Sequence, residues 1–308
     1  MTMKRFPQIR FCLPLCGLLV WFLADAERVR QAASEGLALC ARSVVPALFP
    51  FLAVSSLLVT LGFGQWLSPY FSGLMVSLFR LPGTAGSALL LGLVAGYPVG
   101  ARTAAELYRS GLLTKQEAER LLAFCNNSNP VFLISVLGAG VFGSTRTGLW
   151  LWLIHVASAL ITGLLFRGRN APSGPRAVPR PLSAAAPSFS GAFVSAVRDA
   201  AAAMLSVCAF VTLFYVLSTP FSGLDAPLGP LLIGTLELFS LTPLLSPDRS
   251  GFLLAAGCAG WGGLSVLCQT AAVLEGTGLS LRPCLLGKLV QGVISLLLAM
   301  LLSARALP

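Results

Sequence analysis

Four short runs of glycine, proline and polar residues interrupt an otherwise apolar sequence, and these are the residues that could do chemistry. The runs are Gly96–Gly100, Asn126–Pro130, Glu237–Pro243 and Gly260–Gly263. In hydrocarbon, a backbone group without a helical partner costs several kcal/mol, so such a break persists only inside protein or around a wet cavity. A broken helix offers N–H groups to anions and carbonyl groups to cations. The runs therefore predict a binding site for a small charged solute; the alternative is that they are packing kinks in a structural protein.

Side chains in and beside these runs are the candidate binding residues. Glu237 has apolar neighbours, so it could be a coupling site for a proton or cation, or it could pair with an arginine. Arg102 could meet a carboxylate of the solute or anchor the chain at the cytoplasmic surface. Ser265 and Gln269 are four residues apart and share one helical face. The predicted solute-binding residues are Gly96, Tyr97, Pro98, Gly100, Arg102, Asn126, Asn127, Ser128, Asn129, Pro130, Gly260, Trp261, Gly262, Gly263, Ser265 and Gln269.

No set of catalytic residues accompanies these runs. The sequence contains no HExxH, Walker A, GxSxG or CxxC motif. Its eight cysteines lie mostly inside apolar runs, which is typical of small hydrophobic residues in helices. The single histidine, His155, also lies within an apolar run, and we expect it to be a packed polar residue facing other helices. We therefore predict no enzyme activity, no metal site and no cofactor.

Composition indicates the class of protein that must position these residues. The chain has 308 residues, of which 56% are hydrophobic and 10% are charged. Soluble domains carry about 25% charged residues, so this chain cannot cover a water-facing surface of its own. Its net charge of +10 comes without a basic helix or an aromatic RNA-binding pattern, so nucleic acid is not an expected partner. Apolar runs near 20 residues recur, which predicts an all-α polytopic protein of the lipid bilayer. A homo-oligomer is a candidate assembly.

Two of the runs, Gly96–Gly100 and Glu237–Pro243, follow apolar segments that are too short to cross a bilayer as helices. The arm Ala85–Ala95 would be about 17 Å long as a helix, roughly half the hydrocarbon core. Gly96–Gly100 then ends it and a charged arm follows, which predicts a re-entrant hairpin. The arms around Glu237 predict a second hairpin. Asn129-Pro130 is expected to start a new half-helix that ends near Phe142.

The interruptions fall at corresponding places in two halves of the chain, which predicts inverted repeats with a site between them. We expect about seven full spans and two hairpins. The expected divisions are an N-terminal transmembrane helix plus an interfacial amphipathic helix (1–43), a first repeat (44–166), a basic, Pro/Ser-rich cytoplasmic linker (167–192) and a second repeat (193–308). The string Ala24-Asp25-Ala26 would also suit a signal-peptide cleavage site, but we favour an uncleaved first helix.

The distribution of basic residues predicts the orientation of the chain. With the N-terminus in the cytoplasm and both hairpins re-entrant, 15 of the 21 lysines and arginines fall on the cytoplasmic side and 6 on the outer side. The positive-inside rule favours this arrangement. In this scheme Lys288 is counted on the cytoplasmic side.

Three strings of the sequence resemble a known family. GLVAGYPVGARTAAELYRSG, LLTKQEAERLLAFCNNSNPVFL and GWGGLSVLCQT are similar to the YlbJ-type sporulation integral membrane proteins over roughly residues 40–300. Those proteins belong to the wider group with the Gate, or nucleoside-recognition, domain, which includes concentrative nucleoside transporters and ferrous-iron transport permeases. The family's motifs fall on Gly96, Tyr97, Pro98, Gly100, Asn126, Asn129, Pro130 and Gly260–Gly263. Leu267-Cys268 departs from the family pattern, so the resemblance carries no coupling role to those two positions.

The resemblance implies a location and a function. The chain would lie in the cell membrane, or the membrane surrounding the forespore, of an endospore-forming bacterium. It would be a secondary transporter of a small anionic solute such as dipicolinate. Two other functions stay open: a membrane protein that organises spore envelope assembly without transporting a solute, and a permease for nucleosides or metal ions.

Overall fold

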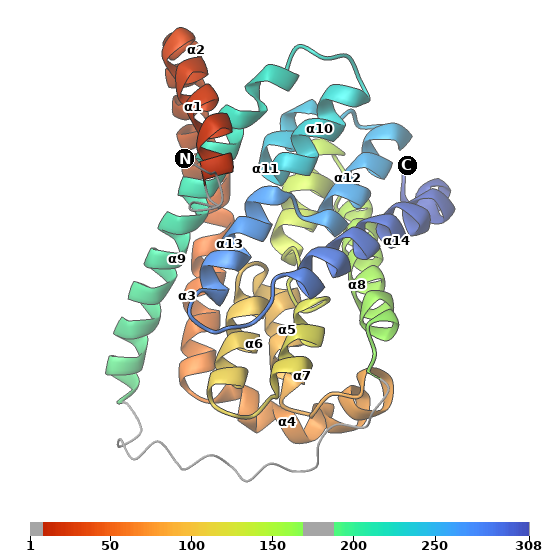
Figure 1. The fold of residues 1–308 in the computed structure, drawn as a ribbon. Coiled ribbons are helices and arrows are strands. Elements are labelled where there is room, and N and C mark those ends of the chain that lie inside the picture. Colours follow the sequence, from red (N-terminus) through yellow and green to blue (C-terminus); the bar gives the residue numbers. More distant parts are fainter. Residues whose placement is uncertain (1–8, 169–187, 308) are drawn as a thin grey trace.

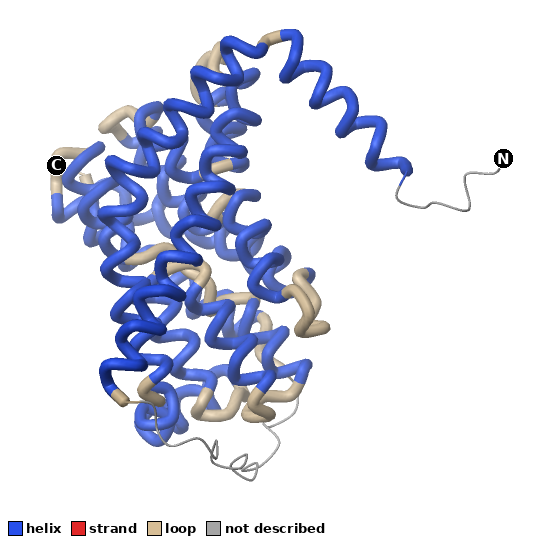
Figure 2. The backbone as a smooth tube through the Cα atoms, turned by 90° about the vertical axis from the view of Figure 1, so that its left-hand side faces the viewer, coloured by secondary structure: helices blue, strands red, loops and turns tan. Residues whose placement is uncertain are grey.

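The computed structural model describes residues 9–168 and 188–307, and helices and loops make up this part of the chain, with no strand. Figure 1 shows the helices gathered into one bundle, and Figure 2 shows the first helix standing away from it. The prediction of an all-α protein is therefore confirmed. The central part of the predicted linker, residues 169–187, lies outside the described residues.

The α-helices have the following bounds: α1 Ile9–Ala24, α2 Ala26–Leu39, α3 Val45–Thr60, α4 Phe63–Leu74, α5 Ala85–Ala95, α6 Val99–Arg109, α7 Lys115–Leu122, α8 Thr145–Leu165, α9 Phe189–Ser218, α10 Leu228–Leu236, α11 Leu238–Leu241, α12 Arg249–Trp261, α13 Leu264–Leu274 and α14 Arg282–Ala306. Three π-helical segments are η2 Cys40–Val44, η3 Met75–Phe79 and η4 Val131–Val141, and two short 3₁₀ segments are η5 Thr219–Phe221 and η6 Thr242–Leu244. The arm expected at Ala85–Ala95 is α5, and the half-helix expected after Asn129-Pro130 is η4.

Five helical stretches in the described part of the chain are long and apolar enough to cross a membrane. They are Ala26–Thr60, Thr145–Leu165, Phe189–Phe221, Arg249–Leu274 and Arg282–Ala306. The expected count of about seven is therefore not confirmed. The apolar part of α1, Cys12–Ala24, is shorter than a span, and the structure describes nothing before residue 9.

The first of these stretches differs from the sequence prediction. The N-terminal division, residues 1–43, was expected to end in an interfacial helix, separate from the first repeat that begins at residue 44. Instead α2, η2 and α3 join into one stretch of 35 residues, Ala26–Thr60. Pro46 lies in the first turn of α3 without ending the helix, because a proline near a helix start needs no N–H partner and the π-helical turn directly precedes it.

The remaining helices form two groups that meet in the middle of the bundle. In Figure 1, α4 to α7 occupy the lower part, and α10, α11 and α12 occupy the upper part. α5 and α6 pack side by side, and a turn at residues 96–98 joins them. α8, α9 and α14 run along the outside. The re-entrant character of the α5–α6 pair and the inverted relation of the two halves stay predictions.

Candidate functional site

The four breaks lie against one another inside the bundle. Tyr97, in the first break, is hydrogen bonded to the hydroxyl of Ser128 in the second. A Cβ atom added at Gly262, in the last break, would lie 3.4 Å from the Tyr97 hydroxyl oxygen. One added at Gly263 would lie 3.4 Å from the Cα atom of Glu237 in the third break. Segments from both halves of the chain therefore converge on one place.

Side chains of the second break hold their own backbone in position. Asn129 Oδ1 accepts a hydrogen bond of 2.8 Å from the backbone N–H of Phe132, so it satisfies one free donor at the start of η4. Asn127 Nδ2 donates to the carbonyl of Phe124, at 2.8 Å, where α7 has just ended. The run of polar residues thus replaces helical hydrogen bonds that the break has removed.

Two residues from outside the break complete it. The backbone N–H of Ser128 donates to His155 Nε2 on α8, at 3.1 Å, and Asn126 Nδ2 donates to Thr270 Oγ1 on α13, at 2.8 Å. His155 is buried and faces other helices, as the sequence predicts. Its partner is a backbone donor of the break, which the sequence did not indicate.

Three polar atoms at this place have no hydrogen-bond partner among the described residues. They are Asn126 Oδ1, Asn129 Nδ2 and His155 Nδ1, and all three side chains are at least 98% buried. A buried polar atom without a partner costs about 1–3 kcal/mol, so native proteins retain few of them. Three in one cluster are free to form hydrogen bonds with a bound molecule.

Lys288 is a buried residue beside the breaks that sequence reasoning missed. It lies on α14, is 1% exposed, and its Nζ donates to Gln291 Oε1 at 2.8 Å. Gln291 Nε2 donates in turn to Asn127 Oδ1, at 3.0 Å. The Lys288 Nζ also lies 5.5 Å from the centre of the Tyr97 ring. The sequence counted Lys288 among the basic residues of the cytoplasmic side, but its side chain is buried in the bundle, because α14 turns this face toward the breaks.

A signal for Lys288 and Gln291 was present in the sequence. Cys284, Lys288, Gln291 and Ser295 follow one another at steps of four, three and four residues, which places them on one helical face. All four are buried. A polar stripe within an apolar segment favours the bundle interior over the membrane surface. We call the following residues the central cluster: Tyr97, Asn126, Asn127, Ser128, Asn129, His155, Lys288 and Gln291.

Glu237 is buried beside this cluster, but its carboxylate already has partners. Glu237 Oε2 accepts a hydrogen bond of 2.6 Å from the backbone N–H of Ser240 and one of 2.8 Å from the Ser240 hydroxyl. The side chain therefore caps the short helix α11, which begins at the next residue. Among the ion pairs of the described residues, none involves Glu237. Its predicted role as a coupling site stays a prediction.

Glycines of the predicted site allow close packing of backbones. A Cβ atom at Gly100 would lie 2.0 Å from the carbonyl oxygen of Cys125, and one at Gly92 would lie 1.8 Å from the same atom. A Cβ at Gly260 would lie 2.8 Å from the carbonyl oxygen of Gln291. Gly100 therefore brings the first break against the second, and Gly260 brings the last break against α14.

The other predicted residues around the last break lie on α12 and α13. Trp261 Nε1 donates a hydrogen bond of 2.9 Å to the carbonyl oxygen of Thr235, and this bond connects the end of α12 to α10. Gln269 Nε2 donates to Ser265 Oγ, at 3.2 Å, so these two residues share a helical face as expected. Both are buried.

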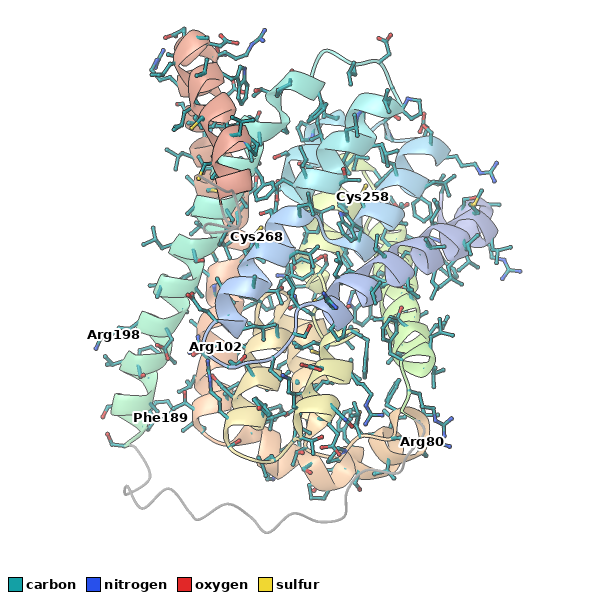
Figure 3. All side chains as sticks on the ribbon, in the orientation of Figure 1. Arg80, Arg102, Phe189, Arg198, Cys258 and Cys268 are labelled. Atoms are coloured by element: carbon teal, nitrogen blue, oxygen red, sulfur yellow. The ribbon has the colours of Figure 1, made fainter. Side chains whose placement is uncertain are left out.

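Arg102 lies away from the central cluster, beside two cavities that both reach Pro98. One cavity, of about 300 Å³, lies between α3, α6 and α9, and the other, of about 350 Å³, lies between α6, α9 and α13. Arg102 pairs with Glu106 on its own helix (3.2 Å) and with Asp199 on α9 (3.5 Å). Figure 3 shows Arg198 on the outer side of α9, away from Arg102. These two cavities, the Arg102 cavities, end at the turn that carries Tyr97, and Gln269 lines the second.

The described residues contain no group of three or more histidine, cysteine, aspartate or glutamate side chains that could hold a metal ion. The buried polar groups are mostly amides and hydroxyls, with one amine. They suit hydrogen bonding and charge recognition.

Comparisons with known proteins give this arrangement a context. Residues 41–146 match the family model described as "Gate: Nucleoside recognition", and this range includes the first two breaks. The chain is 29% identical to the sporulation integral membrane protein YlbJ of Bacillus subtilis, over 88% of this chain and 77% of that protein. No solved structure matches the chain. The resemblance predicted from the motifs is thus confirmed: the chain is an integral membrane protein that is similar to a sporulation protein over most of its length, and its residues 41–146 are similar to the Gate family.

Proposed function

We propose that the chain is a secondary transporter of a small organic anion, which binds at the central cluster. The observation that carries the proposal is the meeting of the breaks with three unpaired polar atoms and one buried amine. Transporters with inverted repeats bind their solutes between broken helices, near the middle of the membrane. η4 and α13 both begin at this place, so the positive ends of two half-helices lie here.

Dipicolinate is the solute that we propose. The curated relative is a sporulation protein, and this spore solute is an aromatic dicarboxylate. Its carboxylates would accept hydrogen bonds from Asn129 Nδ2 and His155 Nδ1. The Arg102 cavities would give it a way to the turn at Pro98.

The direct test is uptake by the purified full-length protein in liposomes. We expect uptake of labelled dipicolinate by the wild type, and its loss in Asn129→Ala. Gln31→Ala is the matched control, because this amide lies on the exposed side of α2, where its side chain donates a hydrogen bond to Glu35. Equal uptake by Asn129→Ala and the wild type would contradict the site.

A nucleoside is the second candidate solute, because the matched family model is described as nucleoside recognition. Uridine and adenosine therefore belong in the same uptake experiment. Uptake of a nucleoside without uptake of dipicolinate would replace the proposed solute. A folded protein that transports none of these solutes would favour the alternative role in organising the spore envelope.

The proposed topology places the N-terminus in the cytoplasm and inverts the two halves. Ser110 follows α6 and Ser222 follows η5, and both are exposed. We expect cysteines at these two positions to react with membrane-impermeant reagents from opposite sides, in a background that lacks the native cysteines. Labelling of both from one side would contradict the inverted arrangement. Cross-linking in the membrane would test the proposed homo-oligomer.

A further inference from the structure

Lys288 is a buried cation without an anionic partner. It is 1% exposed, and none of the ion pairs among the described residues includes it. An ammonium group has three donors and no acceptor. One donor is used by Gln291 Oε1, and the cation also lies beside the face of the Tyr97 ring. A buried charge is normally paired, so the remaining donors are available to an anion that the protein itself does not supply.

The position of Lys288 connects three of the four breaks. Its Nζ lies near Tyr97 in the first break. Through Gln291 it is connected to Asn127 in the second break. Its Cε atom lies 3.4 Å from the place of a Cβ at Gly262 in the last break. A side chain with these neighbours responds to any movement of the breaks relative to one another.

The other charged residues near the site are already engaged. Arg102 pairs with two carboxylates, those of Glu106 and Asp199, and is partly exposed. Glu237 caps α11. Lys288 is therefore the positive side chain in the interior whose charge the described residues leave unmatched.

We propose that Lys288 is the anion-pairing residue of this protein, and that a carboxylate of the solute binds its ammonium group while the adjacent amides of the central cluster orient the rest of the molecule. This inference rests on the proposed function and assigns it a carboxylate as the recognised group. Because Lys288 is covered by Tyr97 and Gly262, the solute reaches it when the turn carrying Tyr97 moves away from the last break. Such a movement is the opening step that alternating access requires.

The experiment measures equilibrium binding of two probes to the full-length protein in nanodiscs. One probe is dipicolinate, and the other is pyridine-2,6-dicarboxamide, which has the same shape without charge. The variants are Lys288→Met, which keeps the length of the side chain, and Lys288→Arg, which keeps its charge. Arg282→Gln is the matched control, because it removes a positive charge from the exposed start of the same helix.

We expect Lys288→Met to bind dipicolinate roughly 30-fold more weakly or worse, the ratio for a lost buried charge partner. Lys288→Met should bind the dicarboxamide almost as well as the wild type does. Lys288→Arg should retain part of the affinity for dipicolinate. Arg282→Gln should bind both probes like the wild type. The melting temperature of the empty protein should stay equal or rise in Lys288→Met, because replacing a buried charge by an apolar chain of similar size is often neutral or stabilising.

Three results would overturn the inference, each in a distinguishable way. If Lys288→Met binds dipicolinate like the wild type, Lys288 is not the anion-pairing residue and the transport proposal stands. If Lys288→Met melts at a lower temperature and loses both probes equally, Lys288 has a structural role. If the stable wild type neither binds nor transports dipicolinate, the proposed function fails together with the inference.

Discussion

The break at Asn126–Pro130 and the two glycines Gly262–Gly263 at the end of the last break both interrupt a helix inside the bundle, but they accommodate the interruption in different ways. Both end one helix and start another inside the bundle. In the first, asparagine side chains and His155 replace the lost backbone hydrogen bonds. In the second, two glycines at φ +87° and +91° turn the chain with no side chain at all. The polar break supplies recognition groups, and the glycine break supplies room for side chains that come from elsewhere, such as Lys288 and Tyr97.

The largest effect is expected at the glycine break. Gly263 has φ 91° and ψ 156°, a conformation that is essentially restricted to glycine. Gly263→Ala should destabilise the protein by about 1–3 kcal/mol from backbone strain, and more because its Cβ would lie 3.1 Å from the carbonyl oxygen of Leu236. Thermal unfolding measures the loss of stability, and uptake by liposomes measures the loss of transport. Gly276→Ala is the control, since Gly276 also has a positive φ but nothing lies within 4 Å of its Cβ position. Equal losses in both variants would show that crowding at the break is unimportant.

The polar break should be most sensitive at His155. His155→Leu leaves the backbone N–H of Ser128 buried without a partner, which should cost about 1–3 kcal/mol. His155→Gln, which keeps an acceptor, should recover part of the melting temperature. If the leucine variant is as stable as the wild type, the break does not depend on this hydrogen bond, and the comparison between the two breaks loses its basis.

A smaller effect is expected at the ion pairs beside the Arg102 cavities, outside both breaks. The Arg102 and Asp199 side chains are 39% and 41% exposed, so their pair is screened by solvent. Arg102→Gln should change the free energy of unfolding by less than about 1 kcal/mol and leave dipicolinate affinity within a few-fold of the wild type. Titration with dipicolinate measures the affinity, and thermal unfolding of the same sample measures the change in stability. If Arg102→Gln loses as much affinity for dipicolinate as is expected for Lys288→Met, Arg102 is the residue that contacts the anion.

The smallest effect concerns Asp248, whose side chain caps α12 outside the membrane-spanning segment. A hydrogen bond from the Gly251 N–H, together with the hydroxyls of Ser250 and Ser246, holds the pKa of the Asp248 carboxyl below its ordinary value. A lowered native pKa means that the stabilisation is present above the unfolded-state pKa and is lost as pH falls through the native one.

The stability advantage of the wild type over Asp248→Asn should therefore shrink on acidification toward pH 3. Thermal melts of the two proteins across this range measure the difference. Ser144→Ala, which removes a cap without a titrating group, should differ from the wild type by an amount that does not depend on pH. An advantage over Asp248→Asn that stays constant down to pH 3 would contradict the role of the Asp248 charge.

Local sequence features predicted much of the broken helices. The arm Ala85–Ala95 and the start of a half-helix after Asn129-Pro130 follow from glycine, asparagine and proline chemistry, which acts within a few residues. The joined helix Ala26–Thr60 was missed, because its first part is amphipathic and its second part is apolar, and a change of composition does not show whether the helix ends there. The burial of Lys288 was missed for a different reason: whether a cation faces water or the bundle depends on how α14 packs against the other helices.

The packing of Gly92 and Gly100 against the carbonyl of Cys125 fixes which parts of the protein can move together. α5, α6 and the start of the asparagine run touch backbone to backbone there, so they cannot slide past one another without a large loss of contact. Gly287, next to Lys288 on α14, packs in the same way, because a Cβ atom there would lie 2.0 Å from the carbonyl oxygen of Ala123. A rocking motion of the hairpin would therefore carry the asparagines and Lys288 together, and a bound solute would keep its amide contacts and its charge contact throughout the motion.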